Sequence, residues 1–159
     1  MRLPSRPSRS ERVLASASGA DGAVSGSRDA IFLPTGDEPR RVPWEQVASA
    51  DWDSEEATLT VVELAPWGEA QPRHLLRLEQ PDRLLQLVRE RVTASIVLQR
   101  HVPLGGRRTA RIVGRRPPSG RGEITWLVEY DAGADPADPA VRATVGDALD
   151  RARADIGEL

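Results

Sequence analysis

The sequence predicts an α+β chain in which seven short strands precede a helix, and a β-hairpin precedes a second helix. Three observations support this fold class. Through residues 11–79, short β-branched and apolar stretches alternate with Gly, Pro and Asp turn signals. Beyond Pro81 the apolar residues recur at helical spacing, and a hairpin pattern and a second helical stripe follow. The 159 residues suffice for one ordinary domain or for two small ones.

Turn signals divide residues 11–79 into the seven strands. Asp21-Gly22 marks the first turn, because glycine adopts positive φ without strain. Residues 34–39 have the composition of a loop, and Pro43 predicts that the fourth strand lies at a sheet edge. The sixth strand is rich in β-branched residues, which favour strands. We expect strands at residues 12–17, 23–27, 30–33, 41–44, 47–52, 58–64 and 73–79.

The first helix is expected over residues 82–100. Pro81 and Asp82 suit its first turn, because proline is tolerated there and a carboxylate complements the helix dipole. Its end is less well defined, because residues 92–97 are rich in β-branched side chains, which are weaker helix formers. The apolar residues at helical spacing are Leu84, Leu85, Val88, Val92 and Ile96.

The C-terminal third predicts a ββα extension. Strands at 109–115 and 123–130 are joined by the Pro- and Gly-rich residues 117–122. Asp138 suits the N-cap of the second helix, and Pro139 suits its first position. The apolar stripe of this helix comprises Val141, Val145, Ala148, Leu149, Ala152 and Ile156.

Three stretches resemble bacterial pleckstrin-homology-like (PH-like) and GRAM-like domains over about residues 11–100. They are Glu-Arg-Val-Leu-Ala from Glu11 with Asp-Gly-Ala-Val from Asp21, Arg-Asp-Ala-Ile-Phe-Leu from Arg28, and Arg-Val-Pro-Trp-Glu-Gln-Val from Arg41 with Ala-Asp-Trp from Ala50. The resemblance implies a seven-stranded antiparallel bent barrel capped by a helix. It also implies a binding scaffold, since such barrels bind phosphoinositides, anionic lipids or protein segments. The loop 19–22 departs from the lipid-binding pattern, because it contains no Lys or Arg.

The resemblance and the composition together predict three regions. Residues 1–10 hold three Arg, two Pro and three Ser, the composition of a flexible basic tail. Residues 11–101 form the PH-like barrel with its helix. Residues 102–159 form the hairpin-and-helix extension, which we expect to pack on the first unit.

Composition excludes several kinds of chemistry. Cysteine is absent, so disulfides, thiol catalysis and thiolate metal sites are excluded. The two histidines, His74 and His101, are too few and too far apart in the sequence for a predicted zinc site. His101 is expected at the end of the first helix. No catalytic motif is present, so we expect a non-enzymatic protein with no cofactor and no metal.

The acidic turn after the fifth predicted strand has two interpretations. Asp51, Asp53, Glu55 and Glu56 offer oxygens that hard cations prefer. A charged hairpin turn explains them better, because the glycine and the terminal carboxylate of an EF-hand loop are missing.

Location is predicted from two absences in the sequence. No apolar run approaches the roughly 18–20 residues of a membrane span. The basic N-terminus is not followed by an apolar stretch, so no signal peptide is expected. We therefore expect a cytoplasmic protein.

The densest group of candidate binding residues is an arginine-rich hairpin. Six arginines fall within residues 107–121, which contain no acid. They could contact lipid or nucleic-acid phosphates. Alternatively, they form a solvated face neutralised by residues 129–159, which hold eight acids and three arginines. The opposite charges also permit self-association as a homodimer. The six are Arg107, Arg108, Arg111, Arg115, Arg116 and Arg121.

The tryptophans divide into expected core and expected surface. Trp44 and Trp52 are predicted to pack in or against the barrel core. Trp67 lies in a Pro-Trp-Gly turn, where it could anchor a partner or a membrane, or fold back as a lid.

The sequence therefore predicts a PH-like binding or scaffold module that is not an enzyme. Its expected ligand is a protein segment or a second copy of the chain. The alternative is peripheral binding to anionic lipid or nucleic acid through the arginine-rich hairpin and the basic tail.

Overall fold

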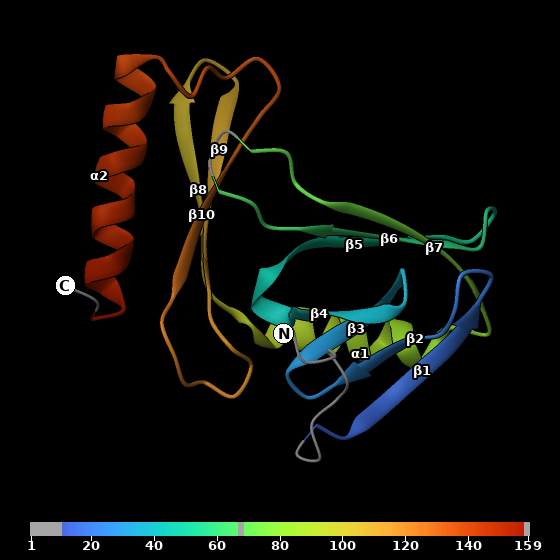
Figure 1. The fold of residues 1–159 in the computed structure, drawn as a ribbon. Helices are drawn as coiled ribbons and strands as arrows, with labels where there is room; N and C mark the ends of the chain where they lie inside the picture. The colour runs from blue at the N-terminus through green and yellow to red at the C-terminus, as the bar shows by residue number, and fades with distance from the viewer. Residues whose placement is uncertain (1–10, 67–68, 158–159) are drawn as a thin grey trace. The chain divides into compact units, whose positions relative to one another are not determined.

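The computed structural model describes residues 11–66 and 69–157 (Figure 1). The chain divides into two compact units. The first comprises the residues up to Ser95 together with Pro117–Gly122, and the second comprises Ile96–Arg116 with the residues from Glu123 onward. Each unit has its own hydrophobic core.

The first unit contains one antiparallel sheet of seven strands in the order β4-β3-β2-β1-β7-β6-β5. β4 and β5 form its two edges, which confirms the edge position that Pro43 predicted. The strands are β1 (Val13–Gly19), β2 (Val24–Ser27), β3 (Ala30–Thr35), β4 (Glu38–Pro43), β5 (Val47–Asp53), β6 (Thr58–Glu63) and β7 (Arg73–Glu79).

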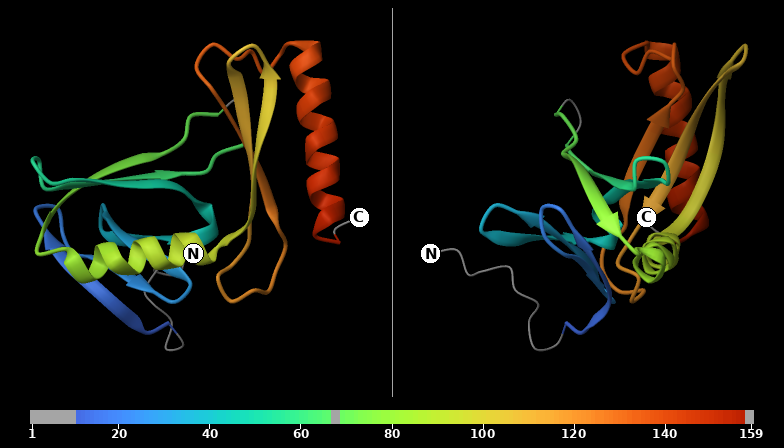
Figure 2. Two further views of the ribbon diagram at one scale, coloured as in Figure 1. Left: turned by 180° about the vertical axis from the view of Figure 1, so that it is seen from behind. Right: turned by 90° about the vertical axis from the view of Figure 1, so that its right-hand side faces the viewer.

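The sheet has two halves, β1–β4 and β5–β7, which Figure 2 shows from two further sides. They join where β1 pairs with β7, through Ser18 with Glu79 and Gly19 with Leu78. The core takes apolar side chains from all seven strands and from the helix α1 (Asp82–Ala94). α1 contacts β1, β2 and β5, and so packs against both halves.

The predicted core tryptophans lie where the sequence places them. Trp44 is fully buried, and its indole Nε1 donates a hydrogen bond to the Ser27 carbonyl at 2.9 Å. It begins the short 3-10 helix η1 (Trp44–Gln46) and does not extend the fourth strand. Trp52 packs against the same core and is partly buried.

The turn between β3 and β4 is tighter than the predicted loop 34–39. β3 ends at Thr35 and β4 begins at Glu38, so that Pro34 and Pro39 face each other in register. Gly36 has φ +58°, a conformation that glycine adopts without strain and that makes this short turn possible.

The predicted first helix is too long, because α1 ends at Ala94 and not at residue 100. The Ser95 hydroxyl donates to the Val92 carbonyl at 2.6 Å just beyond the helix end. The residues that follow form a strand, β8 (Ile96–Gly105). Its β-branched side chains favour strand pairing, which overrides the helical spacing of Ile96. His101 therefore lies in a strand and not at a helix end.

The second unit is consequently a βββα arrangement and not the predicted ββα extension. β8, β9 (Arg108–Arg115) and β10 (Thr125–Tyr130) form an antiparallel sheet in the order β10-β9-β8. The helix α2 (Pro139–Asp155) begins as predicted, with the Asp138 side chain accepting from the Ala140 amide at 2.8 Å. Five of the six residues of its predicted stripe are buried or packed against the second core, and the sixth, Ile156, is the partly buried residue just beyond the helix end.

We predict that Gly19→Ala destabilises the first unit by about 1–3 kcal/mol, the usual cost of overpacking. A Cβ at Gly19 would lie 2.5 Å from the Arg77 carbonyl oxygen, a backbone atom that cannot move without disturbing the β1–β7 pairing. Hydrogen exchange of first-unit amides measures the effect locally. Gly146→Ala in α2 is the control, because a Cβ there meets open space. Unchanged exchange in Gly19→Ala would contradict the close approach.

Candidate functional site

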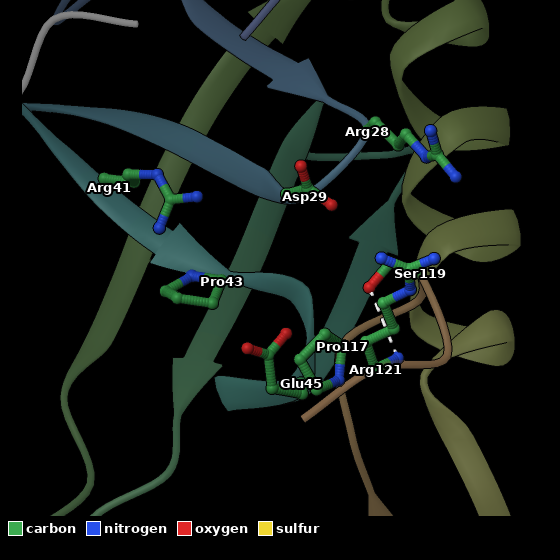
Figure 3. A pocket seen from close by; sticks show the side chains of 8 residues that line it. All are labelled: Arg28, Asp29, Arg41, Pro43, Glu45, Pro117, Ser119 and Arg121. Atoms are coloured by element: carbon green, nitrogen blue, oxygen red, sulfur yellow. Dashed lines mark hydrogen bonds between the residues drawn. The ribbon is translucent and has the colours of Figure 1, made fainter. Parts of the chain in front are cut away.

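A charged cleft of about 640 Å³ lies within the first unit (Figure 3). Its walls come from the β2–β3 turn, the end of β4, η1 and the Pro117–Gly122 segment. We call it the charged cleft, and it is lined by Arg28, Asp29, Arg41, Pro43, Glu45, Pro117, Ser119 and Arg121.

The β2–β3 turn is held in place by one buried serine. The Ser27 hydroxyl accepts from the backbone amides of Asp29 at 3.3 Å and Ala30 at 3.2 Å. The Trp44 amide in turn donates to the Asp29 carbonyl at 3.2 Å. These bonds fix η1 beside the turn, so the side chains of Arg28, Asp29 and Glu45 line one cleft.

The charges in the cleft are unequally paired. Arg41 is neutralised by Glu11 outside the cleft, with Nε donating to the carboxylate at 2.8 Å. Within residues 11–66 and 69–157, neither Arg28 nor Arg121 forms an ion pair. One carboxylate oxygen of Glu45, Oε2, is buried and has no hydrogen-bond partner among the described residues. The cleft is therefore lined by guanidinium groups and by carboxylates, and Arg28 and Arg121 pair with neither carboxylate.

A second recess of about 280 Å³ lies between α1 and the edge strand β5, and we call it the α1–β5 groove. Trp52, Leu85 and Val92 in its wall are partly buried and pack against the core. Among the described residues, β5 is an edge strand that pairs with β6 on one side. Edge strands present backbone groups to which another strand can be added. The groove is lined by Ala50, Trp52, Leu59, Leu85, Val88, Arg89, Val92 and Thr93.

A buried carboxylate connects β4 to β6 and β7. Arg40 donates to Glu63 through two bonds, Nε to Oε2 at 2.7 Å and Nη2 to Oε1 at 3.0 Å. His74 Nε2 lies 2.6 Å from Glu63 Oε2. Burial alone would raise the pKa of Glu63, but the bonds to Arg40 and His74 outweigh it and hold the pKa below its ordinary value. The group ties edge strand β4 to the other half of the sheet.

The six arginines of the predicted hairpin do not gather in one unit. Arg121 belongs to the first unit and lines the charged cleft, whereas the other five belong to the second. Arg107 and Arg108 are exposed at the β8–β9 turn. Along β9, Arg111 pairs with Glu129 at 2.9 Å and Arg115 is only 3% exposed.

The acidic C-terminal region does neutralise arginines of the second unit. Besides the Arg111–Glu129 pair, Arg100 of β8 forms an ion pair with Asp155 of α2. Asp131 accepts from the Thr109 amide and hydroxyl, both at 2.8 Å, and these bonds lower its pKa. The intramolecular interpretation of the hairpin charges is therefore confirmed for Arg111, whereas Arg100 is not one of the six hairpin arginines.

The structure describes the predicted acidic turn but not Trp67. Asp53 accepts from the amides of Glu55 at 3.0 Å and Glu56 at 3.2 Å, which confirms the turn interpretation of the acidic cluster. Trp67 lies outside the described residues.

Sequence reasoning missed Arg28, Arg41 and Glu45 as candidate site residues. An Arg-Asp pair between two apolar strands signals only an exposed turn. Nothing in the local sequence places that turn beside residues 117–122, which are almost ninety positions away. The cleft is therefore a product of tertiary structure.

No protein-family model, curated protein sequence or solved structure matches the chain. In the part of the chain that the structure describes, no helix is both long and apolar enough to cross a membrane. Likewise, the described His, Asp and Glu side chains do not gather in groups of three that could hold a metal ion.

We predict that Glu63→Gln lowers stability at neutral pH by about 1–3 kcal/mol, because it removes the charge that Arg40 and His74 contact. The folded-state pKa of Glu63 is depressed, so its contribution is present above the unfolded pKa and is lost as the pH falls through the folded pKa. The deficit of the variant should therefore shrink in acid.

Urea unfolding of both proteins at neutral and acidic pH checks this prediction. Glu79→Gln, at an exposed position on β7, is the matched control and should leave the pH profile unchanged. A deficit in Glu63→Gln that persists undiminished in acid would contradict the electrostatic explanation.

Proposed function

We propose that the chain is a non-enzymatic binding module of PH-like architecture that binds an extended protein segment along β5. The α1–β5 groove carries this proposal, because it combines an edge strand of the described sheet with an adjacent apolar recess. The PH-like assignment is supported by the resemblance of residues 11–100 and by seven antiparallel strands followed directly by a helix that packs on both halves of the sheet.

The recognition would proceed by strand addition. The backbone of an extended peptide forms hydrogen bonds with the outer side of β5 beyond Val47, and alternate side chains of the peptide turn toward the protein. One apolar side chain then enters the groove and contacts Trp52, Leu85 and Val92. Arg89 at the groove favours a carboxylate on the neighbouring ligand residue. The preferred ligand is thus an extended segment with an apolar residue beside an acidic one.

Binding to an anionic surface through the arginine-rich hairpin receives less support. Arg111 is paired with Glu129, and Arg115 is buried. Arg121 belongs to a different unit from the other five arginines. A phosphate-binding surface needs several free basic groups on one face, and the hairpin offers few.

A phage-displayed library of random linear peptides tests the proposal, followed by affinity measurements on the enriched peptides. Thr93→Trp should weaken binding by about tenfold or more, equivalent to about 1.4 kcal/mol, because the indole fills the groove. Thr93 is exposed, so this change leaves the core intact. Bound peptides should also protect β5 amides from hydrogen exchange.

Ala94→Trp is the matched control, because Ala94 is the next exposed residue of α1 and does not line the groove. It should bind as the wild type does. The proposal fails if no peptide is enriched, or if Thr93→Trp binds the enriched peptides with unchanged affinity.

A further inference from the structure

We propose that the charged cleft is a second binding site, for a small zwitterion that carries a phosphate or carboxylate at one end and an ammonium group at the other. The site lies apart from the α1–β5 groove and shares no lining residue with it. The inference therefore does not rest on the proposed peptide binding.

The charged groups that line the cleft indicate which class of ligand fits it. Three guanidinium groups and two carboxylates line it, and Glu11 neutralises Arg41 from outside. The remaining groups are Arg28, Arg121, Asp29 and Glu45, whose formal charges cancel. An anion that carries no cationic group would find no excess of positive charge here. A ligand that joins an anionic group to a cationic group matches the cleft better than either group alone.

Glu45 forms the subsite that binds the ammonium group of the ligand. Its Oε2 atom is buried and has no hydrogen-bond partner among the described residues. A buried acceptor without a donor is costly, so such atoms usually meet water or a ligand. Figure 3 shows the Glu45 carboxylate in the lower part of the cleft beside Pro117. Because Glu45 lines the cleft, an ammonium group in the cleft can form charge-assisted hydrogen bonds with the side of this carboxylate that faces it.

The subsite that binds the phosphate or carboxylate group is formed by Arg28, Arg121 and Ser119. The Ser119 hydroxyl accepts from the Arg121 amide at 3.4 Å, which leaves its own proton free to be donated. In Figure 3 the guanidinium groups of Arg28 and Arg121 occupy the side of the cleft away from Arg41 and Pro43. Guanidinium groups bind phosphate and carboxylate oxygens well, because their N–H groups match the spacing of those oxygens.

Two proline rings complete the match. Pro43 and Pro117 line the cleft with apolar surface, which suits the methylene groups that separate the two charges of such a zwitterion. A volume of about 640 Å³ also lies within the range of small-molecule sites. The same chemistry occurs in free amino-phosphates, in free amino acids and in the headgroup of phosphatidylethanolamine.

Calorimetric titration with O-phosphoethanolamine tests the proposal, with inorganic phosphate and ethanolamine as probes that each carry one of the two groups. We expect O-phosphoethanolamine to bind about tenfold tighter than either, which corresponds to about 1.4 kcal/mol. γ-Aminobutyrate, titrated in parallel, reports whether a carboxylate replaces the phosphate. Sedimentation with phosphatidylethanolamine-containing vesicles reports whether a lipid headgroup reaches the site.

Variants at each subsite assign the contacts. Glu45→Gln should abolish the preference for O-phosphoethanolamine over phosphate, and Arg121→Gln should weaken both by about tenfold. Arg107→Gln is the matched control, because Arg107 is exposed and belongs to the second unit. Circular dichroism checks that each variant folds. Asp29→Asn gives a second change of charge within the cleft.

Three results would overturn the inference. They are the absence of binding by both O-phosphoethanolamine and γ-aminobutyrate, phosphate binding as tight as that of O-phosphoethanolamine, and a folded Glu45→Gln variant that keeps the wild-type preference. None of these results affects enrichment of peptides on the β5 edge, so the two proposals fail separately.

Discussion

The pairing of β1 with β7 is the constraint on which the first unit depends. It involves only two residue pairs, yet it joins two halves of a sheet that would otherwise be separate. Because the halves share one core, every strand contributes to the burial that stabilises the others. α1 follows β7 directly and adds its apolar face to that core. The groove between α1 and β5 exists because the helix packs against both halves.

A second set of contacts holds the backbone segments that carry the charged residues of the cleft. The buried indole of Trp44 and the hydroxyl of Ser27 fix the β2–β3 turn and the start of η1 with hydrogen bonds of 2.9–3.2 Å. These buried groups are structural, and the charged residues beside them in the sequence are the ones that line the cleft. The rigidity of the cleft wall therefore comes from the core beneath it. The Glu63 ion pairs fix the other end of β4 in the same way.

Local patterns in the sequence were sufficient for most of the fold. Strand alternation, turn residues and the Asp138 cap predicted nearly every element of the first unit and the second helix. The helix end was wrong because Ile96 has helical spacing as well as strand propensity, and only the presence of β9 as a pairing partner decides between them. The candidate site was largely missed. Glu45 and Arg121 line the same cleft only because of the tertiary structure, and no local pattern records that Glu45 has a buried oxygen.

The chain passes between its two units at three points, after Ser95, after Arg116 and after Gly122. The units are therefore interleaved along the sequence, although each is compact. A protein shortened after Ser95 would keep all seven strands and α1 but would lose one wall of the charged cleft. Gene fusion or duplication could not transfer that cleft with the first ninety-five residues alone. Any chain that keeps both wall segments of the cleft must also keep β8 and β9, which lie between those segments in the sequence.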